Sequence, residues 1–338
     1  MNKSTNKVLD VFDILVEQGY EVISGKIFNH KHEEISYSDF RKGLIFSYHM
    51  LVADADKVLD NLFAVGTKGK WYDLPLVSKA RELGPIWSDN EMPFPLDHKQ
   101  LQILNILLFH PEEEVLFIVT GVGGSGKSTF LNIVKQLFNN DFSSASLSDL
   151  ANDFTVAEAV KHRLICSDEL AKGELDCKVL KTLASKQEMF VNPKSKTGYE
   201  VKTQSSLFWC CNQVPKIDCT DTGILRRLIY YCRNTPIKNP NKSLNSKEFT
   251  QEELLIIARR ALSFEDKDWR KMFEKETHKC IMSNNSVFIC NTSDYSKYKE
   301  LCIKKGLKAY SEPNFNQIWD LKEDWKGDLE VIPDDLPF

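Results

Sequence analysis

The stretch "VLFIVTGVGGSGKSTFLNIVKQLF", residues 115–138, decides the fold of this chain. It begins with an apolar run of strand length, and the loop that follows matches the pattern G-x-x-x-x-G-K-[ST]. The residues after the loop continue with the spacing of a helix. A strand that leads through a glycine-rich loop into a helix is the context in which such a loop holds phosphate groups. The pattern therefore predicts a nucleotide site rather than a simple glycine turn.

Each part of this loop has an expected role. The glycines let backbone N–H groups turn inward onto phosphates at the positive end of the helix. Lys127 should reach the β and γ phosphates of ATP, and the Ser128 hydroxyl should bind Mg²⁺. The expected nucleotide-binding set is Gly121, Gly123, Gly124, Ser125, Gly126, Lys127, Ser128 and Thr129.

Further apolar runs of strand length follow the loop, with helical stretches between them. They are "RLICS", "SLFWCC" and "RLIYYC". This alternation favours an α/β domain with a mainly parallel sheet over residues 98–235.

The rest of the chain divides around this domain. Residues 1–90 are expected to form a helical domain, because "NKVLDVFDILVEQG" has apolar residues at helical spacing. This domain would serve as a collar for oligomerisation or bind DNA. Residues 91–97 indicate a linker. Residues 236–320 are expected to be helical, either a plain helical region or a small winged-helix module. Residues 321–338 form an acidic tail.

Composition excludes several classes of protein. Hydrophobic residues make up 42% and charged residues 27%, which is typical of a soluble globular protein. No apolar run approaches the ~18 residues that span a bilayer, so we expect a cytoplasmic protein with no membrane partner, in the bacterial host cytoplasm if it is viral. The net charge of −4 argues against a protein that coats nucleic acid with its whole surface. The nine cysteines include no Cys-x-x-Cys pair and are expected to be reduced thiols.

Polar residues follow two of the predicted strands. Asp168 and Glu169 end the first. In a metal-dependent NTPase, Asp168 would hold Mg²⁺ through water and Glu169 would polarise the attacking water. Asn212 ends the second strand, where its amide would face the γ-phosphate and the attacking water. The alternatives are two acids that cap the next helix and an asparagine that serves as a turn residue.

Two arginines, Arg226 and Arg227, precede the last predicted strand. Arginines at this position are well placed to lie at a subunit boundary and touch a neighbour's γ-phosphate. An arginine finger supplied in trans is worth roughly 10³ to 10⁵ in rate, so such a motor would be silent as a monomer. Surface arginines that flank a strand are the alternative. Of the two, Arg226 is favoured as the finger.

These motifs together resemble a known family. "GVGGSGKST", "RLICSDE", "SLFWCCNQVPKID" and "DTGILRRLIYY" are similar to the motifs of superfamily 3 helicases, and within them to the phage, plasmid and poxvirus-type primase–helicases. The resemblance implies a AAA+ P-loop fold, a hexameric ring and an ATP-dependent DNA helicase that translocates on single-stranded DNA in the replication of a phage or mobile element. No metal-type Cys/His or acidic constellation precedes the motor, so a primase activity is not expected.

A lysine-rich hairpin is predicted between the acids and Asn212. "MFV" and "YEVKT" can pair around the turn "NPKSKTG", which would project Lys194 and Lys196, with Lys202 at the base. It resembles the hairpin that lines the central channel in this family, where six copies would encircle a DNA strand and make binding steeply salt-dependent. A solvated turn is the alternative.

The last residues of the sequence suggest a binding segment. From Asp320 onward there are seven acids and two lysines, a balance of −5. The final stretch resembles the C-terminal tip of bacterial single-stranded-DNA-binding proteins, which implies recruitment of host replication proteins. The alternatives are a disordered acidic end and a tail that folds back on the lysine hairpin as a DNA mimic. The residues concerned are Asp334, Asp335, Leu336, Pro337 and Phe338.

Two other functions stay open at this point. A viral DNA-packaging ATPase has the same nucleotide chemistry but moves duplex DNA without separating its strands. A replication loader or inhibitor that binds ATP and recruits host proteins through its tip would show negligible turnover. Glu169 and the arginine pair argue against that second alternative.

Overall fold

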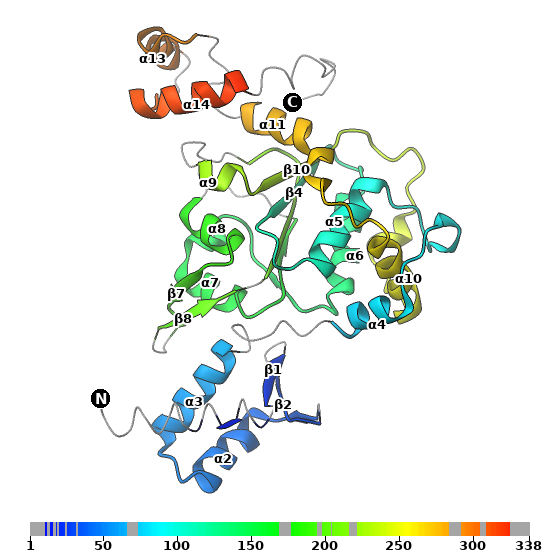
Figure 1. Cartoon of the computed structure of the whole chain (residues 1–338), viewed down its shortest axis with the longest axis vertical. Coiled ribbons are helices and arrows are strands. Elements are labelled where there is room, and N and C mark those ends of the chain that lie inside the picture. The colour runs from blue at the N-terminus through cyan, green and yellow to red at the C-terminus, as the bar shows by residue number, and fades with distance from the viewer. Residues whose placement is uncertain are drawn as a thin grey trace.

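A computed structural model gives the fold of most of the chain (Figure 1). It describes Val11, Ile14, Leu15, Gln18 and residues 20–23, 26–31, 33–65, 74–168, 177–194, 198–203, 205–215, 222–283, 292–304 and 309–324.

The centre of the molecule is a five-stranded sheet in the order β10-β4-β9-β6-β5. Every neighbouring pair of strands is parallel, which confirms the mainly parallel sheet predicted from the sequence. The carboxyl ends of all five strands therefore lie at one edge of the sheet. The strands are β4 (Leu116–Gly121), β5 (Phe142–Ser144), β6 (Leu164–Ser167), β9 (Ser206–Cys211) and β10 (Leu228–Arg233).

Strand β4 is buried on both faces, and its side chains alternate between two hydrophobic cores. Leu116 and Ile118 belong to one core, and Phe117 and Val119 belong to the other. Both faces of a parallel sheet are covered by helices, so its strands are nearly continuous apolar runs. At about 1.5–3 kcal/mol for each large side chain removed from water, these residues anchor the domain.

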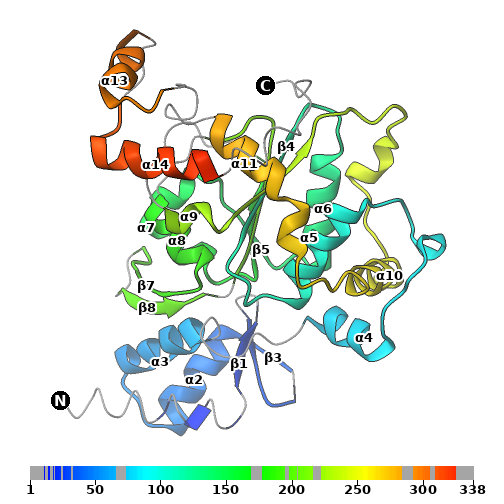
Figure 2. The same ribbon diagram turned by 45° about the horizontal axis from the view of Figure 1, so that its top comes forward.

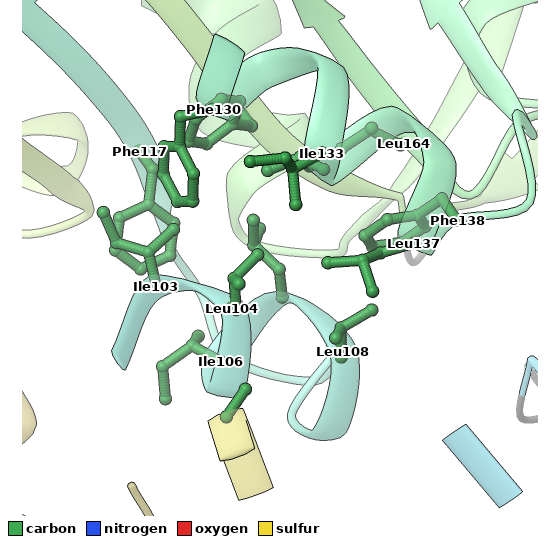
Figure 3. Packing of buried hydrophobic residues seen from close by; sticks show 14 of the residues in the cluster. Ile103, Leu104, Ile106, Leu108, Phe117, Phe130, Ile133, Leu137, Phe138 and Leu164 are labelled. Atoms are coloured by element: carbon green, nitrogen blue, oxygen red, sulfur yellow. The ribbon is translucent and has the colours of Figure 1, made fainter. Parts of the chain in front are cut away.

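Helices cover the two faces of this sheet as separate groups. One core contains side chains of α4, α5, α6 and α10, and Figure 3 shows α5 and α6 packed together within it. The other core contains side chains of α7, α8, α9, α11, α13 and α14. The first group is α4 (Pro75–Leu83), α5 (His98–Phe109), α6 (Lys127–Leu137) and α10 (Gln251–Leu262). The second is α7 (Asp153–Ala159), α8 (Cys177–Ala184), α9 (Thr222–Leu225), α11 (Glu274–Ser283), α13 (Tyr295–Lys304) and α14 (Glu312–Asp324).

Four short 3-10 turns complete the described helical structure around the sheet. They are η1 (Asp89–Glu91), η2 (Asp149–Ala151), η3 (Lys242–Asn245) and η4 (Trp269–Met272).

The predicted hairpin is present as β7 (Glu188–Val191) paired antiparallel with β8 (Tyr199–Lys202). Val191 and Val201 are buried in the core of the second group of helices, so the base of the hairpin is fixed to the domain. Strand β8 also contacts α3 of the N-terminal region, and Figures 1 and 2 both show the hairpin facing that region.

The N-terminal region differs from the prediction of a helical domain. Its helices α2 (Tyr37–Ser47) and α3 (Val52–Val65) accompany a three-stranded antiparallel sheet. The stretch "EVISGKIF" explains the sheet, because two β-branched runs flank a Ser-Gly pair, which is a hairpin signal rather than a helical one. The strands are β1 (Glu21–Ile23), β2 (Lys26–Phe28) and β3 (Glu34–Ile35).

After β10, the regular secondary structure of the described residues is helical, and loops such as residues 246–250 connect the helices. A capping box between Thr250 and Glu253 starts α10, since each side chain binds the other residue's backbone N–H. The described residues of 251–324 contain no strand that would form the wing of a winged helix. None of the described helices is both long and apolar enough to cross a bilayer.

Candidate functional site

The glycine loop lies at the carboxyl edge of the sheet, between β4 and α6. Gly121 has φ of 144°, and a Cβ atom there would lie 2.1 Å from the carbonyl oxygen of Arg233. Gly126 has φ of 86° and precedes the first residue of α6. Both positions need glycine, because side chains are strained in this backbone region and at Gly121 there is no room. Gly123 and Gly124 are exposed, so the outer face of the loop is open bare backbone.

Lys127 is the buried cation of this loop. Its Nζ donates to the carbonyl oxygens of Gly121 and Val122, each at 2.8 Å, and lies 3.3 Å from Ser125 Oγ. Burial lowers the pKa of the Lys127 ammonium from its ordinary value. The ammonium is therefore held inside the curve of the loop by carbonyl dipoles, where a phosphate would compete for it.

The hydroxyl residues of the loop have different environments. Ser125 is buried and donates to the Val122 carbonyl at 2.8 Å, so it shapes the loop. Ser128 is exposed at the start of α6, where a metal could reach its hydroxyl. The Thr129 hydroxyl donates to the side-chain oxygen of Asn245 in η3.

Neutral thiols form the floor beneath the loop. Burial raises the pKa of Cys166 and of Cys211 to about 12. Burial also raises the pKa of Cys210 well above its ordinary value, and its Sγ lies 3.5 Å from the Lys127 carbonyl oxygen. These thiols are therefore uncharged at neutral pH, and the positive charge of Lys127 is not cancelled from below. None of the described cysteines forms a disulfide bond.

The polar residues at strand ends gather at the same edge as the loop. Asp168 directly follows β6 and Asn212 directly follows β9, and β9 pairs with both β4 and β6. Both side chains are exposed. The charges of Lys127 and Asp168 both influence the pKa of Cys210, which lies between them in the sheet. Glu169 lies outside the described residues.

The two candidate finger arginines have opposite environments. Arg227 is 3% exposed, and its guanidinium binds the Glu114 carboxylate and the Gly223 carbonyl. Arg226 is exposed, and its guanidinium has no partner among the described residues. Arg227 is thus part of the domain's own structure, whereas Arg226 faces outward.

Arg226 lies at the edge of the sheet opposite the loop. It precedes β10, whose first residue pairs with Leu116 and whose last residue pairs with Gly121. A six-residue strand at ~3.3 Å per residue spans about 20 Å. An arginine side chain does not bridge that distance, so Arg226 cannot reach a phosphate held by the loop of its own chain.

Arg233, at the carboxyl end of β10, contacts the loop and was missed by sequence reasoning. Its Nε donates to the Ser125 carbonyl at 2.7 Å, and its Nη1 donates to Asp97 at 2.8 Å. Asp97 also accepts from the Tyr231 hydroxyl and caps α5. The available signal was its position, because side chains at the carboxyl ends of parallel strands meet at the ligand site.

A segment after β10 lies against the same loop and was also not predicted. The Ile237 N–H donates to the Gly124 carbonyl at 3.0 Å, and Ile237 Cδ1 is 2.9 Å from where a Gly126 Cβ would lie. Farther on, Asn132 and Gln136 of α6 donate to the Lys247 carbonyl. The sequence of this segment, "NTPIKNPNKSLNSK", is polar and has no pattern that would predict which part of the domain it contacts.

Of the residues expected to bind DNA, only Lys194 can be placed fully. It is exposed in the turn after β7. Lys202 ends β8, but its side chain is not described, and Lys196 lies outside the described residues. The tip predicted to bind a partner, residues 334–338, also lies outside them. Among described residues there is no cluster of three or more His, Cys, Asp or Glu that would hold a metal ion by itself.

The chain is similar to one protein family and to solved structures. A family described as being of unknown function, DUF5906, matches residues 119–227. No curated protein matches the chain. Three solved apo structures of the C-terminal region of NrS-1 are similar, at 14%, 15% and 15% identity, with TM-scores of 0.47, 0.49 and 0.50. They cover 93%, 94% and 96% of this chain, which in turn covers 84%, 86% and 86% of theirs. The last of these is similar to this chain in fold.

Proposed function

We propose that this chain is an ATP-driven motor that moves on single-stranded DNA as a ring of identical subunits, a hexamer, and separates strands in the replication of a phage or mobile element. One observation carries the proposal. The nucleotide loop and Arg226 lie at opposite edges of the same sheet, so a complete site needs the loop of one subunit and the arginine of another. The AAA+ assignment belongs to the same proposal.

The loop residues fit ATP and Mg²⁺. The bare backbone of Gly123 and Gly124 offers N–H groups to phosphate oxygens, and the Lys127 ammonium is already inside the curve of the loop. Ser128 and Asp168 are exposed oxygen donors at the same edge, as a hydrated Mg²⁺ requires. When bound, the metal would neutralise developing charge on the transferred phosphoryl group.

The remaining residues would orient and activate water. Glu169 would accept the proton of the attacking water, and Asn212, exposed at the end of β9, would hold that water in line. Arg226 of a neighbouring subunit would add positive charge at the γ-phosphate. Hydrolysis would then require assembled neighbours.

Movement on DNA would come from the β7–β8 hairpin. Strand β9, which Asn212 directly follows, comes soon after the hairpin in the chain. A change in the contacts of Asn212 after hydrolysis would shift the hairpin, and Lys194 with Lys196 would carry the DNA phosphates. Packaging of duplex DNA is the competing function, and a forked substrate that is not unwound would favour it.

Mixing two inactive variants tests shared sites directly. Lys127→Ala and Arg226→Ala should each reduce ATP turnover by roughly 10³. In a mixed ring, some sites combine the intact loop of an Arg226→Ala subunit with the intact arginine of a Lys127→Ala subunit. If the two variants are mixed in equal amounts and assemble at random, about a quarter of the sites are complete, so turnover should recover to about a quarter of wild type. A mixture that stays inactive contradicts the proposal, as does full turnover by a monomer.

A further inference from the structure

A cavity of about 500 Å³ lies at the amino edge of the sheet, on the side away from the nucleotide loop. Residues of α9, β10, η4, α11 and α14 line it. Figure 2 shows the helices α9, α11 and α14 as neighbours. Its volume falls in the range that takes a small ligand or a few side chains of a peptide. Arg226, the residue proposed to act on a neighbour, is part of its wall.

The cavity has an apolar floor and a cationic rim. Its apolar lining includes Leu228, Ile281 and Leu321. Its charged lining is three cations and one acid, a balance of +2 with histidine neutral. These are Arg226, Arg270, Lys271 and Glu274.

Arg270 is held rigidly at this rim. It donates to the Arg226 carbonyl at 3.2 Å and to Glu113 at 3.1 Å, and its guanidinium lies over the Trp269 ring. Lys271 is exposed and pairs with the exposed Asp268 at 3.0 Å. Such surface pairs are weak, so Lys271 can exchange Asp268 for another carboxylate at little cost.

We infer that the acidic, apolar segment 328–338 of the same chain binds in this cavity and covers Arg226. Leu321 lines the cavity and stands in α14, which ends at Asp324. The residues that follow α14 include four acidic residues and one lysine, a net charge of −3. The apolar residues Leu336 and Phe338 lie close to these acids in the sequence. Anionic groups would meet the cationic rim, and the Phe338 ring would enter the apolar floor.

Chain length favours this occupant over a separate protein. Leu336 is 12 residues after Asp324, where α14 ends (336 minus 324), a reach of up to about 40 Å at ~3.3 Å per residue. The segment is tethered beside the cavity, at an effective concentration on the order of millimolar. A weak contact between segment and cavity would therefore still be formed most of the time.

The consequence is control of assembly. With the segment bound, Arg226 would be masked from a neighbouring subunit, and turnover would begin only when the neighbour's nucleotide displaces it. This effect on turnover rests on the proposed function, whereas binding of the segment does not.

Crosslinking in the full chain tests the binding. Phe338→p-benzoylphenylalanine is introduced, and equal amounts of ¹⁴N- and ¹⁵N-labelled protein are mixed and irradiated without nucleotide. Mass spectrometry should find crosslinks within single chains, to residues 225–229, 270–281 or 321. Crosslinks only between chains, to the hairpin at 188–202, or none, would overturn the inference.

A charge reversal at the rim adds a matched control. Lys271→Glu should reduce the crosslink yield about fivefold, since it removes one rim charge and adds an opposing one. Lys297→Glu should leave the yield unchanged, because Lys297 is equally exposed at 72% and pairs with Asp294 at the same i,i+3 spacing. Equal yields in both variants would contradict the charge contact.

Turnover separates this inference from the proposed function. Asp334→Lys combined with Asp335→Lys should raise ATP turnover at low protein concentration about threefold, because release of Arg226 favours assembly. Crosslinks with unchanged turnover would overturn masking of Arg226 and leave binding supported. A protein without any turnover would overturn the proposed function, while the crosslinks would still decide the binding.

Discussion

Both edges of the central sheet carry basic residues, but these residues have different environments at the two edges. At the carboxyl edge, the cations Lys127 and Arg233 are bound to backbone carbonyls of the loop itself. At the amino edge, Arg226 is exposed and its guanidinium is without a partner among the described residues. We propose that the first edge binds a small anionic ligand and that Arg226 at the second edge contacts another subunit. The two edges are about 20 Å apart along β10, so within one chain Arg226 cannot act on a ligand held by the loop.

The largest expected effect comes from Gly121 at the carboxyl edge. Gly121→Ala would place a Cβ 2.1 Å from the Arg233 carbonyl oxygen, so β4 and β10 must separate. We expect the free energy of unfolding to fall by about 3 kcal/mol or more, measured by urea denaturation. Gly123→Ala is the control, because a Cβ there meets nothing within 4 Å. Equal stability of both variants would show that the packing at Gly121 is not as described.

Substitution of Arg227 should mainly affect stability, whereas substitution of Arg226 should mainly affect ATP turnover. Arg227→Ala leaves Glu114 without its buried partner and should lower the free energy of unfolding by about 2–3 kcal/mol, since Glu114 is itself half-exposed. Arg226→Ala should change that free energy by less than about 0.5 kcal/mol and still abolish turnover. Thermal unfolding and ATPase assays on both variants check this. A stable, inactive Arg227→Ala variant would reverse the assignment.

A smaller effect is expected from Arg233, which supports the loop. Arg233→Ala removes charge-assisted hydrogen bonds to Ser125 and Asp97, so the loop should bind nucleotide about tenfold more weakly. Titration with a fluorescent ATP analogue measures it. Arg259→Ala is the control, because Arg259 donates to the Gly84 carbonyl in the same way but far from the loop. Unchanged affinity in the Arg233→Ala variant would limit the role of this arginine to packing.

The smallest effect belongs to the hairpin. Lys194→Ala should reduce the salt dependence of single-stranded DNA binding by about 0.7 in slope for each DNA phosphate that is no longer neutralised. Fluorescence anisotropy at several salt concentrations measures the slope. Lys79→Ala, on the exposed pair with Glu82, is the matched control. A slope that stays the same in both variants would remove Lys194 from the DNA site.

Much of the central domain was predictable because its signals are local. The glycine loop, the strand before it and the helix after it are one continuous stretch, and the hairpin and the capping box of α10 are also short-range patterns. The N-terminal sheet was missed because residues 1–90 were interpreted as helical from the spacing in "NKVLDVFDILVEQG", although residues 21–28 contain β-branched and aromatic residues that favour a hairpin.

The site itself was only partly predictable. Asp168 and Asn212 could be named because each ends an apolar run, and parallel strands bring their carboxyl ends together. Arg233 ends an apolar run in the same way. It was overlooked because the pair Arg226 and Arg227, at the other end of that strand, was interpreted as the functional arginines. The contacts of Ile237 and Asn245 with the loop depend on how the chain returns after β10, which no local pattern specifies.

By itself, the sequence determined the strand, glycine loop and helix unit, the parallel sheet and the polar residues that follow the strands, because these follow from residue type and from periodicity along the chain. Only the tertiary structure decided that Arg227 is buried against Glu114 while Arg226 faces outward, and that Arg226 lies about 20 Å from the loop of its own chain. The physical reason is that burial and distance across a sheet depend on which strands become neighbours, and adjacent residues in the sequence can be assigned to opposite environments by that packing.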